Sequence, residues 1–155
     1  MYARILVAVD ESDTSRHALQ QAIELARKLS ASVRMVHVLD MSWLPIGPEV
    51  AIDTGALSAA RRGVGEKIIA ASRDTAKAAG FEAEAVLIET ETPMQQVAET
   101  IVKEAARWGA DLVVMGTHGR RGFQHLMLGS VAEQTVRRSS GPVLLIPLPK
   151  GSPST

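Results

Sequence analysis

The sequence predicts an α/β protein whose single domain is built on one open, mostly parallel sheet with helices on both faces. Five short apolar runs, rich in β-branched residues, mostly lack the polar alternation of half-exposed strands, as is typical of parallel strands buried on both faces. Segments with helical periodicity lie between these runs, so strands and helices alternate along the chain. The 155 residues also match the common length of one domain.

The expected strands are the five apolar runs, which cover residues 5–9, 33–39, 83–88, 112–115 and 143–148. Each run is too short for a helix. We expect the domain to span residues 1–148 and the polar tail, residues 149–155, to be disordered. Residues 40–55 lack periodicity and are expected to form a long loop, which is either a binding lid or a simple insertion.

The first two expected helices follow the first and second strands. A single apolar stripe predicts the first helix, and it consists of Leu19, Ala22, Ile23, Ala26 and Leu29. Ser12, Asp13 or Thr14 can cap its amino end. The second helix is expected over residues 57–79, and Gly80 ends it.

The third and fourth helices carry clearer start signals. Thr92-Pro93-Met94-Gln95 combines a capping box with proline at the first helical position, and Gly109 is the stop. The apolar stripe of this third helix consists of Met94, Val97, Ala98, Ile101, Val102 and Ala105. The fourth helix is expected to begin at Ser130, where Ser130-Val131-Ala132-Glu133 forms another capping box.

Composition excludes several classes of function. Seventeen basic residues balance seventeen acidic ones, so no overall field favours nucleic acid or an anionic membrane. The apolar runs are far shorter than the ~20 residues that cross a bilayer. The chain has no cysteine, which removes thiol catalysis, thiolate metal sites and disulfides and fits a reducing compartment. We therefore expect a cytoplasmic protein with no membrane or nucleic-acid partner.

The stretch after the fourth strand is the most informative part of the chain. It has the spacing Gly116-x-x-Gly119, then nine residues, then Gly129-Ser130 at the expected helix start. Glycines let backbone amides approach a ligand, and a helix amino end offers free N–H groups, so the pattern predicts an anion cradle. The alternative is a flexible connection in which Ser130 only caps the helix. Arg120 and Arg121 favour phosphate, because guanidinium groups suit phosphate oxygens.

Asp10, directly after the first strand, is the second candidate. It can accept hydrogen bonds from ribose hydroxyls or adenine, or help to hold a cation; the alternative is that it caps the first helix. Of the histidines, His37 is expected to be a core residue, and His118 lies in the glycine loop where it could contact a ligand. We expect no metal site made by protein side chains alone and no catalytic constellation.

With these residues identified, the chain resembles the universal stress proteins over nearly its whole length. The match is carried by four segments, which are Ile5-Leu6-Val7-Ala8-Val9-Asp10, Val36-His37-Val38-Leu39-Asp40, Asp111-Leu112-Val113-Val114-Met115-Gly116 with the glycine motif after it, and Gly141-Pro142-Val143-Leu144-Leu145-Ile146-Pro147. The resemblance implies a Rossmann-like fold, of the adenine nucleotide alpha hydrolase-like kind, with strand order 3-2-1-4-5. It also implies a homodimer formed through the last strand, residues 143–148.

The complete glycine motif resembles that of the ATP-binding branch of the family. In that branch, the resemblance implies that Asp10 contacts the nucleoside, the backbone at Val38 reads the adenine edge, and Met115 and Gly116 line the ribose. It implies phosphate contacts, often with a divalent cation such as Mg²⁺ or Mn²⁺ held through the phosphates, at Gly119, Gly129, Ser130 and Val131. Arg120 and Arg121 are an addition that we expect to strengthen phosphate binding.

These observations give one leading hypothesis and two alternatives. The leading hypothesis is a stress protein that binds ATP, or AMP or ADP, as a nucleotide-dependent regulator with at most slow ATP hydrolysis. The alternatives are a nucleotide-free dimeric interaction module and an ATP-dependent adenylyl-transfer enzyme. Because only 3% of residues are aromatic, adenine is expected to be held by aliphatic walls and backbone hydrogen bonds.

Overall fold

The computed structural model describes residues 1–42, 54–92, 94–118 and 128–150, and these form the predicted α/β fold. Five strands make one parallel sheet in the order β3-β2-β1-β4-β5. They are β1 (Arg4–Ala8), β2 (Ser32–Leu39), β3 (Glu84–Glu89), β4 (Leu112–Gly116) and β5 (Val143–Ile146). Strand number, direction and order therefore confirm the prediction. The strand ends differ by one or two residues, and β5 stops at Ile146, where the Thr117 carbonyl accepts from the Gly129 N–H and not from the chain beyond β5.

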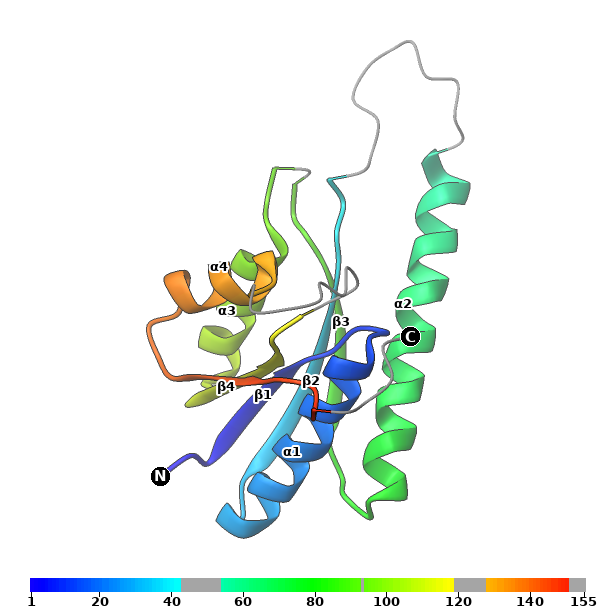
Figure 1. Cartoon of the computed structure of the whole chain (residues 1–155). Helices are drawn as coiled ribbons and strands as arrows, with labels where there is room; N and C mark the ends of the chain where they lie inside the picture. The colour runs from blue at the N-terminus through cyan, green and yellow to red at the C-terminus, as the bar shows by residue number, and fades with distance from the viewer. Residues whose placement is uncertain (43–53, 93, 119–127, 151–155) are drawn as a thin grey trace.

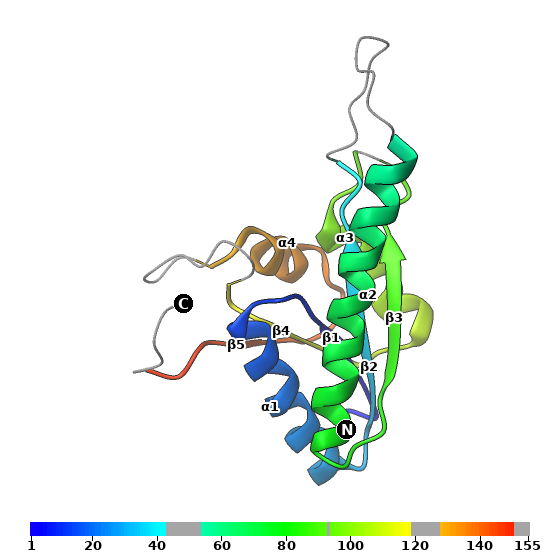
Figure 2. The ribbon, with the colours of Figure 1, turned by 90° about the vertical axis from the view of Figure 1, so that its right-hand side faces the viewer.

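Four helices cover the two faces of the sheet: α1 (Asp13–Leu29), α2 (Thr54–Ala78), α3 (Val97–Trp108) and α4 (Ser130–Arg138). Helices α1 and α2 lie on one face, and α3 and α4 lie on the other (Figures 1 and 2). Successive side chains of β1 point to opposite faces of the sheet. Ile5 and Val7 pack in the core under α1 and α2, whereas Leu6 packs with α3 on the other face. Among the helices of the described residues, none combines the length and the apolarity needed to cross a membrane.

The predicted start of the third helix is wrong. Helix α3 begins at Val97 with Gln96 as its N-cap, not in the segment after Thr92. The reason is local, because the Gln95 N–H donates to the Thr92 carbonyl at 3.1 Å and the Gln95 side chain accepts from the Glu91 N–H at 2.5 Å, which fixes a turn there. Met94, expected on the apolar stripe, is 85% exposed.

The fourth helix begins at Ser130 as expected, but Ser130 does not cap it. Gly129 is the N-cap, and its carbonyl accepts from the Glu133 N–H at 2.9 Å, so Ser130 is the first helical residue. Two other signals are confirmed. Ser12 caps α1, and Gly109 ends α3 in a left-handed conformation, with φ 75°.

Candidate functional site

The carboxyl ends of β1, β2 and β4 meet at one edge of the sheet, and this edge carries the predicted site residues. Strand β1 pairs with both β2 and β4, and the chain leaves it toward β2 before returning on its other side to β4. This is the point at which the strand order reverses, where ligands bind in open α/β sheets. The described residues of the predicted set lie after or at these strand ends or at the start of α4; they are Asp10, Val38, Met115, Gly116, Gly129, Ser130 and Val131. Gly119 and Arg120, with Arg121, lie outside the described residues.

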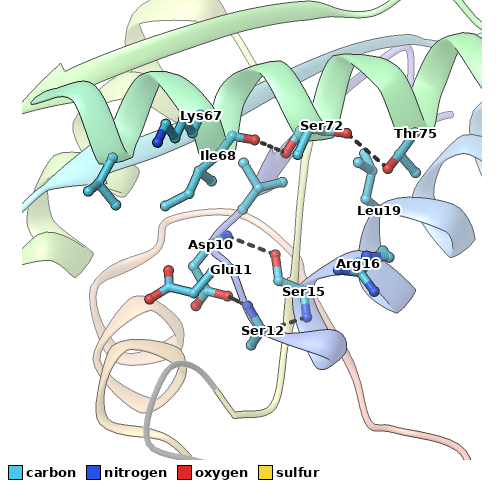
Figure 3. A pocket seen from close by; sticks show the side chains of 13 residues that line it. Asp10, Glu11, Ser12, Ser15, Arg16, Leu19, Lys67, Ile68, Ser72 and Thr75 are labelled. Atoms are coloured by element: carbon cyan, nitrogen blue, oxygen red, sulfur yellow. Dashed lines mark hydrogen bonds between the residues drawn. The ribbon is translucent and has the colours of Figure 1, made fainter.

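The turn after β1 is held by a chain of short hydrogen bonds (Figure 3). Asp10 Oδ1 accepts from the Ser12 N–H at 2.8 Å, and the Asp10 N–H donates to Ser15 Oγ at 2.8 Å. Ser12 Oγ in turn accepts from the Ser15 N–H at 3.1 Å and so caps α1. Asp10 is therefore not the helix cap. Its carboxylate is fixed half-buried at the end of the first strand.

The end of β4 packs against the first turn of α1. Met115 is buried, at 5% exposure. A Cβ built on Gly116 would lie 2.6 Å from Thr14 Cγ2, 3.1 Å from Thr14 Cβ and 3.2 Å from the Thr14 carbonyl carbon. The contact with the backbone cannot be relieved by turning the Thr14 side chain. Close packing of α1 on β4 is thus a sufficient reason for glycine at position 116, independent of any ligand.

We expect Gly116→Ala to lower the free energy of unfolding by about 1–3 kcal/mol, as other overpacked cores do. Chemical denaturation measures this change. The matched control is Gly116→Ala combined with Thr14→Ser, which removes the nearest methyl group and is expected to recover part of the loss. A fully stable single variant would contradict the packing explanation.

The start of α4 is anchored next to the end of β4. The Gly129 N–H donates to the Thr117 carbonyl at 2.8 Å, and the Thr117 N–H donates to the Ile146 carbonyl at 3.1 Å. Gly129 supplies no side-chain cap, whereas Ser12 caps α1. Ser130 and Val131, in the first turn, are exposed. The amino end of α4 therefore presents backbone N–H groups that no N-cap side chain occupies, which is an arrangement suited to an anion.

Two hollows lie beside this edge of the sheet. Some of the predicted site residues line one hollow, and others line the second. One, of about 320 Å³, lies between the start of α1 and the middle of α2, and Asp10 lines it together with Lys67 (Figure 3). The other, of about 220 Å³, lies between the end of β2, the start of α3 and the start of α4, and Ser130 and Val131 line it. Val38 and Met115 line neither hollow.

Sequence reasoning missed several residues of the second hollow. Gln134 contributes a buried Oε1 that has no hydrogen-bond partner in the described part of the chain, and Gln95 is buried at 8% exposure. The sequence shows Gln95 in the turn before α3 and Gln134 on α4. A search for apolar periodicity counts only hydrophobic side chains and therefore does not detect them. Thr90 was also missed, and its hydroxyl accepts from the Met41 N–H at 3.0 Å, which fastens the chain just beyond β2.

The two histidines near the edge differ in their surroundings. His37 is partly buried, and its Nδ1 lies 2.7 Å from the Val9 carbonyl oxygen, so its hydrogen bond is satisfied as expected but the side chain is not in the core. His118 Nδ1 lies 2.9 Å from Thr117 Oγ1, and its buried Nε2 has no partner among the residues described.

The clearest electrostatic shifts lie at the opposite, amino edge of the sheet. Burial raises the pKa of the Glu104 carboxyl, but hydrogen bonds and charge from Arg107 and Arg34 outweigh it and lower that pKa overall. Burial also opposes the shift at Asp111, where the N–H groups of Ala3 and Arg4 donate to the carboxylate and lower its pKa. These groups join the chain start and α3 to the sheet, so their pKa shifts report on stability and not on the candidate site.

The described residues contain no group of three His, Asp or Glu side chains placed to hold a metal ion. A cation at this edge would therefore need ligands from another source, such as the oxygens of a bound phosphate.

The chain is similar to universal stress proteins over nearly its whole length. The model of the universal stress protein family matches residues 1–147. A universal stress protein of Methanocaldococcus jannaschii is 32% identical over 150 residues, which cover 97% of this chain and 85% of the relative. A crystal structure of a member of that family from Burkholderia pseudomallei aligns with a TM-score of 0.76 and 35% identity, covering 95% of this chain and 97% of the other.

Two further similar structures contain adenine nucleotides. A universal stress protein from Archaeoglobus fulgidus, solved in complex with dAMP, aligns with a TM-score of 0.65 and 26% identity over 94% of this chain and 98% of the other. Another universal stress protein, in complex with cAMP, aligns with a TM-score of 0.63 and 25% identity over 94% of this chain and 96% of the other.

Proposed function

The chain belongs to the universal stress protein family, and on that basis we propose that it binds an adenine nucleotide, with ATP as the leading candidate, at the carboxyl edge of its sheet. The observation that carries the proposal is the amino end of α4, which lies beside β4 at the reversal of strand order and has no side-chain cap. Similar structures that hold dAMP and cAMP support an adenine nucleotide as the ligand.

In this proposal the nucleoside lies over the ends of β1 and β2 and the phosphates lie at the start of α4. Asp10 contacts the nucleoside, the backbone at Val38 reads the adenine edge, and Met115 and Gly116 border the ribose. Phosphate contacts are proposed for Gly119, Arg120, Gly129, Ser130 and Val131. A Mg²⁺ or Mn²⁺ ion would then be bound through the phosphate oxygens, since the described side chains offer no cluster for it.

The proposed biological role is nucleotide-dependent regulation in the cytoplasm, with at most slow ATP hydrolysis. Calorimetric titration of nucleotide-stripped protein with ATP, with and without Mg²⁺, tests the binding. We expect a dissociation constant at or below the micromolar range, about −8 kcal/mol. Absence of heat at protein concentrations well above that range would contradict the proposal, and equal affinity for GTP would argue against adenine recognition.

We also propose that two copies of the chain pair through the outer edge of β5. Bonds from the Val113 N–H to Pro142 and from the Thr117 N–H to Ile146 show that the peptide groups of even-numbered residues here face β4. In a parallel ladder the peptide groups of Val143 and Leu145 then face away from the sheet. Leu144, on the same strand, is 38% exposed. Among the described strands none pairs with this outer edge of β5, and such an edge next to exposed apolar side chains suits a second copy.

We expect Leu145→Pro to convert a dimer to a monomer in sedimentation analysis, because proline removes the outward N–H and leaves the bonds to β4 in place. Leu145→Ala is the matched control, since it shortens the same side chain and keeps the N–H. If the wild type and both variants all sediment as dimers, the dimer interface lies elsewhere. A monomeric wild type would contradict the proposed pairing itself.

A further inference from the structure

The ladder between β1 and β2 stops abruptly at Val9. The Val9 N–H donates to the Val36 carbonyl at 2.9 Å, and Ala8 is in register with Val36. In a parallel ladder, each residue bonds to the residues before and after its partner on the next strand. The next bond in this ladder would therefore run from the Val38 N–H to the Val9 carbonyl.

The side chain of His37 makes a hydrogen bond to that carbonyl instead. Its Nδ1 lies 2.7 Å from Val9 O, and because a carbonyl only accepts, the ring must carry a hydrogen on Nδ1. Among the backbone hydrogen bonds of the described residues that lie outside regular elements, none joins Val38 to Val9. The imidazole thus satisfies the carbonyl of Val9, the residue directly after β1, and keeps the ladder from closing on Val38.

The His37 side chain projects from the face of β2 that is covered by a helix. Side chains alternate along the strand, so His37 shares a face with Met35 and Leu39, and this is the face that α2 covers. Helix α2 approaches so closely that a Cβ on Gly65 would lie 2.9 Å from Leu39 Cδ2. The His37 side chain leaves the strand on this covered face, and its Nδ1 reaches the Val9 carbonyl.

We propose that His37 is a positioning residue for base recognition, because it reserves the peptide N–H and C=O of Val38 for the nucleotide. This inference rests on the proposed function. Both groups of Val38 face the β1 side of the strand, as those of Val36 do, and they offer one donor beside one acceptor. The Watson–Crick edge of adenine has an acceptor at N1 and a donor at N6, which this pair matches. Guanine has a donor at N1 and an acceptor at O6, so in the orientation that adenine takes it would set donor against donor and acceptor against acceptor. His37 thereby contributes to selection of adenine over guanine.

Substitution of His37 separates this role from general packing. In His37→Leu the Val9 carbonyl is released and accepts from the Val38 N–H, which closes the ladder. We expect the dissociation constant for ATP to rise about tenfold, the loss of roughly one hydrogen bond, and the preference for ATP over GTP to fall. His37→Asn is the matched control, because its Nδ2 can donate from the position of Nδ1. It is expected to retain both the affinity and the preference of the wild type.

Nuclear magnetic resonance on the ligand-free wild-type protein tests the same idea without any variant. We expect the neutral His37 ring to carry its hydrogen on Nδ1, and no through-hydrogen-bond coupling between the Val38 nitrogen and the Val9 carbonyl carbon. A hydrogen on Nε2 alone, or a measurable coupling in the wild type, would overturn the inference even if His37→Leu did not fold.

The outcomes distinguish the two proposals. If the wild type binds ATP and a folded His37→Leu binds ATP and GTP as the wild type does, only the role of His37 is wrong. If the wild type binds no nucleotide, the proposed function fails and the role of His37 in base recognition fails with it. The missing hydrogen bond between Val38 and Val9 can still be tested by the coupling measurement.

Discussion

Gly129→Asp is expected to weaken ATP binding at least a hundredfold, about 2.7 kcal/mol, while the protein remains as stable as the wild type or becomes slightly more so. These opposite effects arise because the substitution improves a helix cap and places a negative charge where the phosphates are proposed to bind. Calorimetric titration measures the first effect, and thermal unfolding without ligand measures the second.

The backbone at Gly129 makes this substitution compatible with the fold. Its φ of −61° and ψ of 151° are extended values that any residue adopts. Aspartate is a preferred N-cap, better than glycine by a few tenths of a kcal/mol. Its carboxylate would accept hydrogen bonds from the first-turn N–H groups of α4 and would be favoured by the helix dipole. The same N–H groups would then be unavailable to phosphate, and the carboxylate would repel it.

Two controls assign the effect to charge at the phosphate site. Gly129→Asn has a similar shape and also caps the helix but is neutral, so it is expected to reduce ATP affinity much less than Gly129→Asp. Adenosine, which has no phosphate, is expected to bind the wild type and both variants equally. If Gly129→Asp bound ATP with wild-type affinity, the phosphates would not lie at the start of α4. If it bound adenosine and ATP equally poorly, the substitution would be acting on the nucleoside region or on the fold.

The parts of the fold that the sequence predicted are those governed by burial. Strands such as residues 33–39 are recognisable because a central parallel strand is covered on both faces and must be apolar throughout. The stops of α2 and α3 were predictable because Gly80 and Gly109 adopt the left-handed conformation that favours glycine, whereas α1 ends at a left-handed serine that gives no such signal. The start of α3 and the cap of α4 were not, because capping patterns also occur in turns and within first helical turns. Side-chain bonds such as that of Gln95 to Glu91 decide between these possibilities.

The candidate site was predictable to the level of the sheet edge and no further. Topology alone brings the ends of β1, β2 and β4 together, so residues that follow these strands, such as Asp10, could be selected from the sequence. The reason for glycine at position 116 depends on a contact with Thr14 across about a hundred residues, which no local pattern encodes. The bond of His37 to Val9 likewise depends on strand register and not on spacing.

Glu104→Gln is expected to lower the free energy of unfolding by about 2–3 kcal/mol at neutral pH, the largest stability change predicted for a single side chain here. Glu104 lies on α3 and is 4% exposed. Its Oε1 accepts from Arg34 Nη1 at 2.8 Å and from Arg107 Nη2 at 2.7 Å, and its Oε2 accepts from Arg107 Nε at 2.7 Å. Replacing the carboxylate with an amide removes its charge and one acceptor, and it leaves the half-buried Arg34 with weaker compensation.

The location of Arg34 explains why the loss should be large. Arg34 links β2 to β3 through Glu84 and to α3 through Glu104, and its guanidinium carbon lies 4.9 Å from the centre of the Trp108 ring. Its side chain is only 15% exposed, so solvent cannot replace the missing carboxylate. Arg107 is 66% exposed. We therefore expect Arg107→Ala to cost less than Glu104→Gln, because the buried pair of Glu104 with Arg34 remains and removal of the exposed Arg107 side chain admits water to the carboxylate.

The pH dependence of this difference identifies its electrostatic origin. Burial raises the pKa of Glu104, but Arg107 and Arg34 lower it further, so the pKa in the folded protein lies below the ordinary value of 4.5. The unfolded chain then binds the proton more readily, and the wild type loses this stabilisation as the pH falls from about 4.5 through the folded pKa. The glutamine side chain of the variant does not titrate. The stability difference between wild type and Glu104→Gln should therefore be constant from about pH 6 to pH 8 and shrink below pH 4.5. Asp111 is present in both proteins, so its own contribution to the pH dependence largely cancels in this difference. Urea denaturation across this range measures the difference, and a gap that stayed constant in acid would show that Glu104 stabilises the fold through packing and not through its charge.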